Sequence, residues 1–442
     1  MKNVAVISLG CDKNRVDTER MLYRISRGGY GICDISDADA IVINTCAFIE
    51  SARQESIDTI LSCAELKKTG KLKTLIVTGC LPQKYSDELK SALPEVDAFL
   101  GAFEYDKIVD AIEGEEAKSD LINSETEKFY ADENVPRLLT TFPHTAYVKI
   151  AEGCDNHCTF CTIPSIRGRY RSRPIADVVS EAKSLVDDGV KELILVAQDV
   201  TRFGEDRGKN ELIELLTELE KLSPEFGIKL LYCYPERVTD ALIEKIAGSD
   251  SISPYIDIPI QHVADNVLKR MNRKTTGAQI EALIAKLHAK GITVRTTLMV
   301  GFPGESDGDF NELCEFVKRA KPDYTGLFAY SKEDGTPAAR LDGHIKKSDK
   351  LKRVKQLGKI CSDVMLELNR QKIGKVLKVL YEDVDYDKNM FVGRAETQVP
   401  DVDGRVYFTS NAPVEVGTVY NVKINDADEY DLYGVAEQIQ KE

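Results

Sequence analysis

The stretch AEGCDNHCTFCTIP, residues 151–164, decides how the middle of this 442-residue chain is interpreted. It places Cys154, Cys158 and Cys161 within eight residues, in the pattern C-x3-C-x2-C. Thiolates are soft ligands that suit zinc, copper(I) and iron–sulfur clusters. A structural zinc site with His157 as fourth ligand is one interpretation. Against it, His157 directly precedes Cys158, and the sequence has no second C-x2–4-C pair of the kind that zinc sites usually use.

A four-iron cluster is the other interpretation of this loop. Three cysteines leave one iron of such a cluster without a protein ligand, so a substrate or cofactor can bind that iron directly. The loop follows the first of six apolar segments that alternate with helical segments: TAYVKIAEG, ELILVAQD, IKLLYCYP, YIDIPIQ, TVRTTLMVGF and YTGLFAYS. This alternation predicts a (β/α) barrel or partial barrel, whose active site lies at the C-terminal ends of the strands.

A second set of cysteines lies near the N-terminus. Short segments rich in β-branched residues, NVAVISLG, DAIVINT and TLIVTG, alternate with helical segments and predict a parallel α/β sheet. They are followed directly by Cys11, Cys46 and Cys80. The C-terminal ends of parallel strands lie along one edge of a sheet, where ligands bind. We therefore expect these three thiolates to converge on a second cluster with an open iron.

The pattern changes to a period of two after Gly374. Five short segments separated by turn residues, from KVLKVLYEDV to YDLYGVAEQ, predict a small antiparallel β-barrel. The expected fold class is therefore α/β and multidomain. Its expected parts are an N-terminal α/β domain (1–115), a charged linker (116–139), a central barrel (140–371) and a C-terminal β-barrel (372–442).

Composition limits the function classes. The net charge is −14, which is unfavourable for binding nucleic acid through its phosphates. An odd count of 11 cysteines favours metal or redox chemistry over a disulfide framework. No apolar run reaches the ~18 residues of a membrane span. The apolar run in MKNVAVISLGC is short and is followed by Lys13 and Arg15, so we expect a buried strand, no membrane contact and a cytoplasmic protein.

The two cysteine sets together resemble a known family. C-x3-C-x2-C on the first loop of a βα barrel resembles the radical S-adenosylmethionine (SAM) superfamily. SLGCDKNRVDTE, INTCAFIESA and TGCL in addition resemble the methylthiotransferases, over essentially the whole chain. The resemblance implies two [4Fe-4S] clusters and two SAM molecules, and it implies a TRAM-like C-terminal barrel. Cys154, Cys158 and Cys161 would hold the radical-generating cluster, and Cys11, Cys46 and Cys80 the auxiliary cluster that delivers sulfur.

Other residues receive roles by their positions. Gln198, Gln261 and Arg295 lie at or within expected barrel strands and are candidates to bind SAM. Gly301, in GFPGES, would let the backbone approach the adenosine. No conventional acid–base or nucleophilic residue is assigned. The stretch IRGRYRSRP, residues 166–174, carries four arginines that either grip a carboxylate or backbone near the site or form a solvated face.

The family has two branches that differ in substrate. One modifies a tRNA adenosine, and the other replaces an aspartate Cβ–H with a methylthio group on ribosomal protein S12 of the small subunit. Residues 371–442 contain 8 Lys and Arg against 14 Asp and Glu, a net charge of −6. Such a surface repels phosphate and attracts a basic protein. GCDKNRVDTE and VGRAETQVPDVDG also resemble the ribosomal-protein branch.

We therefore expect an enzyme that acts on a ribosomal protein or the ribosome. It needs a one-electron donor, such as flavodoxin or ferredoxin, and a sulfur source. tRNA is the alternative substrate. A non-catalytic, metal-stabilised protein that binds RNA or ribosomes is the alternative from another class.

Overall fold

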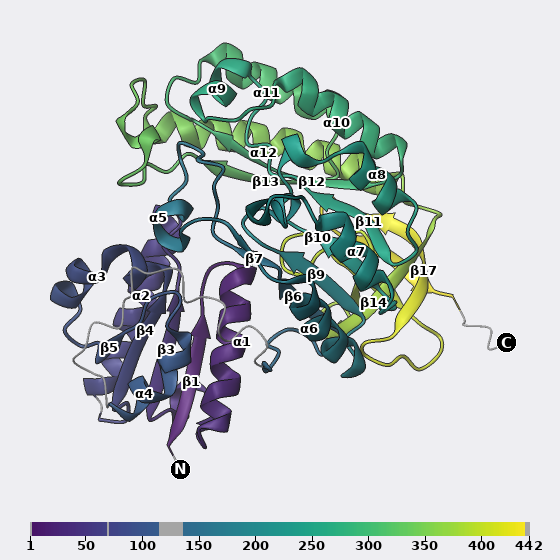
Figure 1. Ribbon diagram of the computed structural model, residues 1–442. Helices are drawn as coiled ribbons and strands as arrows, with labels where there is room; N and C mark the ends of the chain where they lie inside the picture. Colours follow the sequence, from purple (N-terminus) through teal and green to yellow (C-terminus); the bar gives the residue numbers. More distant parts are fainter. Residues whose placement is uncertain (1, 69, 115–135, 438–442) are drawn as a thin grey trace.

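The computed structural model of the chain describes residues 2–68, 70–114 and 136–437. Two parallel sheets are followed along the chain by a closed β-barrel (Figure 1). The expected multidomain α/β fold with a small C-terminal β-barrel is thus confirmed. The expected linker lies outside the described residues up to residue 135. Helices of the described segments are all too short or too polar to cross a membrane.

The N-terminal sheet has five parallel strands in the order β2-β1-β3-β4-β5. The three expected strands are present. β3 and β4 run directly into Cys46 and Cys80, and β1 ends three residues before Cys11. Two additional strands of two residues each extend the edges. The strands are β1 (Asn3–Ser8), β2 (Gly31–Ile32), β3 (Ala40–Thr45), β4 (Thr74–Gly79) and β5 (Ala98–Phe99).

Helices cover both faces of this sheet, so its central strand β3 is buried at every position and mostly apolar. Ile41 and Ile43 point toward one apolar cluster, which includes Ile60 of α2, and Val42 points toward the other, which includes Met21 of α1. The helices are α1 (Asp12–Arg27), α2 (Glu50–Lys68), α3 (Cys80–Ala92) and α4 (Ile108–Glu113).

The central sheet has six parallel strands in the order β13-β12-β11-β10-β9-β6, with no jump in sequence order. All six expected strands are present. The sheet stays open between β6 and β13, which makes it a partial barrel. The strands are β6 (Thr145–Lys149), β9 (Glu192–Val196), β10 (Gly227–Leu230), β11 (Ile252–Asp257), β12 (Thr293–Val300) and β13 (Tyr324–Ala329). A separate ribbon pairs β7 (Ala151–Glu152) with β8 (Arg171–Ser172).

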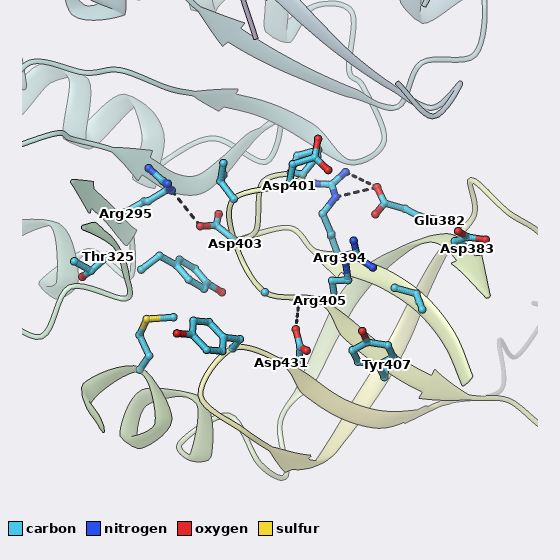
Figure 2. A pocket seen from close by; sticks show the side chains of 18 of the residues that line it. Arg295, Thr325, Glu382, Asp383, Arg394, Asp401, Asp403, Arg405, Tyr407 and Asp431 are labelled. Carbon is cyan, nitrogen blue, oxygen red and sulfur yellow. Dashed lines mark hydrogen bonds and ion pairs between the residues drawn. The ribbon is translucent and has the colours of Figure 1, made fainter. Parts of the chain in front are cut away.

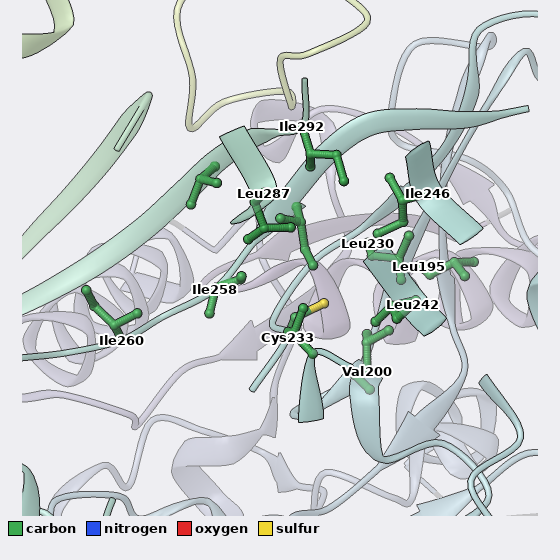
Figure 3. Packing of buried hydrophobic residues seen from close by; sticks show 14 of the residues in the cluster. Leu195, Val200, Leu230, Cys233, Leu242, Ile246, Ile258, Ile260, Leu287 and Ile292 are labelled. Carbon is green, nitrogen blue, oxygen red and sulfur yellow. The ribbon is translucent and has the colours of Figure 1, made fainter. Parts of the chain in front are cut away.

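Helices pack on the outer face of this sheet around the largest apolar core of the described chain. Figure 3 shows Leu195 and Leu230 of the strands beside Leu242 and Leu287 of the helices. Each fully buried leucine of this kind contributes roughly 1.5–3 kcal/mol. The helices are α6 (Ile175–Asp187), α7 (Leu212–Glu220), α8 (Asp240–Ala247), α9 (Asp265–Arg270), α10 (Gly277–Ala289), α11 (Asp307–Ala320) and α12 (Lys347–Arg370). The short helix α5 (Ile163–Arg167) packs instead against α3 of the N-terminal domain, where Ile166 joins the apolar core.

The C-terminal strands form a closed barrel in the order β14-β15-β16-β18-β17, drawn in yellow-green to yellow in Figure 1. Four of its five strand pairs are antiparallel, as expected, and β16 and β18 are parallel. A closed ring with an odd number of strands cannot alternate direction at every pair. The strands are β14 (Val376–Asp385), β15 (Met390–Ala395), β16 (Val406–Thr409), β17 (Val419–Ala427) and β18 (Leu432–Ala436).

Candidate metal-cluster sites

The three-cysteine loop lies between β7 and α5, directly after the first strand of the partial barrel. Gly153 has φ +79°, and a Cβ there would stand 2.0 Å from the Arg169 carbonyl oxygen, so the loop is fixed against the returning chain. The Cys154 amide donates to the Gly168 carbonyl at 3.1 Å. His157, the proposed fourth zinc ligand, is exposed and has φ +51°.

The three thiols are electrostatic neighbours. Burial raises the pKa of Cys154 to about 12, and the charge of Cys158 adds to the shift. Burial, and after it the charge of Cys158, also raises the pKa of Cys161 well above its usual value. Because only thiolates bind metal, filling this site must release protons.

Two side chains that the sequence analysis missed hold Cys158. The Tyr234 hydroxyl lies 3.0 Å from the Cys158 sulfur, and Arg273 Nη1 donates to the same sulfur at 3.7 Å. The guanidinium of Arg273 also stacks over the Tyr234 ring, 4.0 Å from its centre. Donors aimed at a ligand sulfur stabilise its thiolate form and orient it toward the metal. The signal that the sequence offered for this contact was Tyr234, the second tyrosine of YCYP, at the end of a barrel strand.

The three N-terminal cysteines also come together. Gly10 has φ +94°, and a Cβ there would stand 3.1 Å from the Cys46 sulfur, so the residue before Cys11 packs against Cys46. Burial raises the pKa of Cys46 to about 12, followed by the charges of Cys80 and Cys11. The three cysteines therefore lie near one another, and their convergence on a cluster stays a prediction.

The donor chemistry of both groups fits an iron–sulfur cluster. Each group offers three soft sulfur atoms from cysteines that influence one another's ionisation, and each has an arginine that donates to one of its sulfurs: Arg273 to Cys158 and Arg167 to Cys80. Within residues 2–68, 70–114 and 136–437, no three His, Cys, Asp or Glu side chains are grouped tightly enough to hold one single ion.

Buried charges join the two cysteine groups. Arg167, at the end of α5, donates to Asp17 of α1 and to Glu152 of β7, at 3.1 Å in each case. Lys149 of β6 donates to both of these carboxylates as well. Burial opposes the ionisation of Glu152, but Arg167 and Lys149 outweigh it and lower the pKa to about 2.

Two arginines of IRGRYRSRP are thus not part of a solvated face. Arg167 and Arg173 are buried at 2% and 0% exposure, and Arg173 pairs with Glu181 at 2.5 Å. Of its four arginines only Arg169 is exposed. It lines a cavity of about 500 Å³ beside Cys154, together with Arg202.

Three of the proposed SAM-binding residues lie at the C-terminal ends of strands. Gln198 follows β9; its Nε2 donates to Glu152, and its Oε1 is buried without a hydrogen bond from any described residue. Gln261 follows β11, has φ +71° and pairs with Leu298 of β12. Gly301 follows β12 with φ +76°, and the side chain of Lys350 occupies the space that a Cβ would take.

Arg295 lies apart from the other three. It is the third residue of β12 and pairs with Asp257 at 3.1 Å and with Asp403 of the C-terminal barrel at 3.3 Å. Figure 2 shows it facing Asp403 in a cavity of about 410 Å³ between the partial barrel and the C-terminal barrel. The sequence analysis did not resolve where along its strand Arg295 lies. In the structure it is near the start of β12, away from the C-terminal strand ends.

Comparisons with known proteins agree with this architecture. Sequence profiles described as "Uncharacterized protein family UPF0004", "Radical SAM superfamily" and "TRAM domain" match residues 3–101, 148–317 and 373–436. The solved structure of the radical S-adenosylmethionine methyltransferase TsrM from Kitasatospora setae superposes with a TM-score of 0.56 at 13% identity, over 85% of this chain and 79% of that one. At that identity the likeness shows the fold alone.

Curated relatives match over nearly the whole length. The "Ribosomal protein uS12 methylthiotransferase RimO" of Clostridium botulinum (strain Loch Maree / Type A3) is 45% identical over 98% of this chain and 97% of its own. The protein of the same name from Clostridioides difficile (strain 630) is 46% identical over 98% of both chains. This chain therefore belongs to the RimO family of methylthiotransferases, which are radical SAM enzymes.

Proposed function

We propose that this enzyme replaces the Cβ–H of an aspartate in ribosomal protein uS12 with a methylthio group, and that it uses two [4Fe-4S] clusters and two SAM molecules. The near full-length match to relatives named as uS12 methylthiotransferases is the observation that carries the proposal. The two separate groups of three cysteines support the count of two clusters. We place the domain boundaries at residues 115, 139 and 371.

Each cysteine group has its own proposed role. Cys154, Cys158 and Cys161 hold the radical-generating cluster, and Cys11, Cys46 and Cys80 hold the auxiliary cluster. When bound, the clusters and SAM supply the radical that breaks the C–H bond. They also supply the sulfur and the methyl group that replace the hydrogen.

The protein's own residues orient these groups and keep water away. Tyr234 and Arg273 fix the sulfur of Cys158. Gln198, whose Oε1 is open to a donor, and Gln261 are the proposed SAM contacts, with Gly301 giving close backbone approach. Tyr232 of the partial barrel donates to Asp12 at 2.9 Å, and the Lys13 ammonium lies 3.2 Å from the centre of the Tyr232 ring. These two contacts pack α1 against the partial barrel beside Cys11.

Charge favours a basic protein substrate over tRNA. The C-terminal barrel segment has a net charge of −6, and its stacked pair Tyr407 and Tyr433 is covered by Lys388, 3.5 Å from the Tyr407 ring centre. Arg167 and Arg173, two of the four arginines of IRGRYRSRP, are buried in ion pairs. Phosphate binding needs exposed cations, whereas a Lys/Arg-rich protein is attracted by exposed carboxylates.

The test uses the reconstituted enzyme under anaerobic conditions with SAM and a reductant. Mass spectrometry should find the methylthio modification on uS12 and none on tRNA. The Cys154→Ala variant should leave uS12 unmodified, because it removes a ligand of the radical-generating cluster. Full modification by that variant would refute the radical mechanism, and no modification by the native chain would favour a non-catalytic binding protein. Tight tRNA binding with a steep salt dependence would refute the substrate choice.

A further inference from the structure

Arg167 occupies an unusual position for a charged side chain. It is the last residue of α5, six residues after Cys161, and its side chain is only 2% exposed. From there it extends into the N-terminal domain and donates from Nη2 to the sulfur of Cys80 at 3.4 Å. A residue from the loop of one cysteine group thus contacts a cysteine of the other group.

The two terminal nitrogens of Arg167 serve different partners. Nη1 donates to Asp17 and Glu152, while Nη2 donates to the Asn14 side-chain oxygen at 2.7 Å and to Cys80. The planar guanidinium therefore has its orientation fixed by partners from three segments of the chain. Asn14 is itself fixed, because its amide donates to the carbonyls of Leu9 and Thr45, which lie close to Cys11 and Cys46.

The buried carboxylates alone do not account for Nη2. Two acids, Asp17 and Glu152, lie beside two bases, Arg167 and Lys149, so the local charge is balanced through Nη1 and the lysine ammonium. A lysine at position 167 would keep that balance with one nitrogen. The second nitrogen is directed at the amide of Asn14 and the sulfur of Cys80.

We propose that Arg167 is a positioning residue for the auxiliary cluster. Its Nη2 holds the Cys80 sulfur, and this contact raises the reduction potential of the cluster. Hydrogen bonds to ligand sulfurs and nearby positive charge stabilise the more negative, reduced cluster. The inference rests on the proposed assignment of Cys11, Cys46 and Cys80 to that cluster. It also makes the loop of the radical-generating cluster responsible for the redox state of the sulfur-delivering one.

The experiment isolates the auxiliary cluster. In the parent, Cys154, Cys158 and Cys161 are replaced by alanine, so that about four irons should remain after reconstitution. The midpoint potential is measured by redox titration followed by electron paramagnetic resonance. Arg167→Lys should keep the iron and the charge but shift the potential to more negative values. The matched control is Arg173→Lys, at another buried arginine that pairs with Glu181 and the Lys149 carbonyl, and it should leave the potential unchanged.

The outcomes separate this inference from the proposed function. Bound iron with the parental potential in Arg167→Lys would overturn the role of Arg167 alone. A parent that binds no iron would overturn the assignment of the auxiliary cluster and this inference with it. If Arg167→Lys does not fold, the double variant Asp17→Asn/Arg167→Gln removes one acid and one base together. It should show the same negative shift, and an unchanged potential would again refute the inference.

Discussion

Arg394 illustrates how single buried charges hold this molecule together. It belongs to β15 of the C-terminal barrel and pairs with Glu192 of the central sheet at 2.6 Å. It also pairs with Glu382 at 2.7 Å (Figure 2). Burial opposes the ionisation of Glu192, but Arg394 and then Lys229 outweigh it and lower the pKa to about 2. The Arg394–Glu192 pair therefore joins the C-terminal barrel to the central sheet through charges that are buried away from water.

Replacing Arg394 with methionine should lower the free energy of unfolding by about 3–5 kcal/mol. The reason is that Glu382 loses its arginine partner, and Glu192 keeps only Lys229 as a counterion. Urea denaturation measures the change. The control is Arg319→Met, which breaks an exposed pair with Glu281 and should cost less than about 1 kcal/mol. Equal losses in the two variants would contradict a structural role for the buried pair.

At this scale, spacing and strand position predicted the residue types that carry chemistry but not their partners. Six cysteines could be assigned because C-x3-C-x2-C and three strand ends are visible in the sequence. Arg167 and Tyr234 could not be placed, because their sulfur contacts depend on chain segments 87 and 76 residues away. The burial of Arg167 likewise depends on counterions that no local pattern contains.

Among the elements, the connection between β15 and β16 has the clearest structural role. Val399 packs with Tyr147, Tyr255 and Tyr324 on the inner face of the partial barrel. Asp403 in the same connection accepts from the Tyr255 hydroxyl at 2.8 Å and from the Val399 amide at 2.9 Å, and it pairs with Arg295. This inserted loop, together with the Arg394–Glu192 pair, thereby fixes the C-terminal barrel to the central sheet.

Asp403→Ala should lower the free energy of unfolding by about 2–4 kcal/mol, since it leaves the buried Arg295 and the Tyr255 hydroxyl short of a partner. Asp401→Ala is the control in the same loop. Asp401 is 62% exposed and pairs with Arg15, so its loss should cost less than about 1 kcal/mol. Chemical denaturation of both variants decides, and a larger loss at Asp401 would contradict the insertion as the anchoring contact.

The same aspartate gives a pH dependence with a defined sign. Burial raises the pKa of Asp403 to about 6 in the folded state, despite the charge of Arg295. An unfolded aspartate titrates near about 3.9. Between these values the folded chain binds more protons, so this group's contribution to the free energy of unfolding falls as pH rises from about 4 to 6. The difference between the native chain and Asp403→Asn should follow that course in denaturation at several pH values, and a constant difference would contradict it.

The sequence predicted the elements better than their pairing. The six central strands and five C-terminal strands were found from apolar runs and period-two segments. The two-residue strands β2 and β5 were missed, because two residues show no periodicity. The parallel pair of β16 and β18 depends on closure of the barrel, which no single segment encodes.

At the scale of the whole molecule, buried ion pairs occur where the domains meet. Arg167 joins Glu152 to Asp17 of the N-terminal domain, Arg20 of that domain lies 3.9 Å from Glu181, and Arg394 of the C-terminal barrel pairs with Glu192. Glu152 and Glu192 are fully buried and the Glu181 side chain is 11% exposed, and in each case the neighbouring cations overcome the effect of burial and lower the pKa to about 2. The domain order could be predicted from the sequence, whereas the docking of the domains could not, because it depends on these long-range pairs.

These glutamates should make the assembled molecule sensitive to acid. A glutamate titrates near about 4.3 when unfolded, so the stabilisation is present above that pH and is lost as pH falls toward about 2. The free energy of unfolding should therefore drop between pH 4 and 2.5, with the three domains separating in small-angle scattering. Glu192→Gln should show a shallower drop over this range, and a slope equal to that of the native chain would contradict the assignment.

The central claim is that this chain holds two separate iron–sulfur clusters. The most direct measurement is anaerobic reconstitution with iron and sulfide, followed by quantification of iron and the absorption spectrum. The account predicts about eight irons per chain, falling to about four when Cys154, Cys158 and Cys161 are replaced by alanine. Bound zinc with no iron would contradict it.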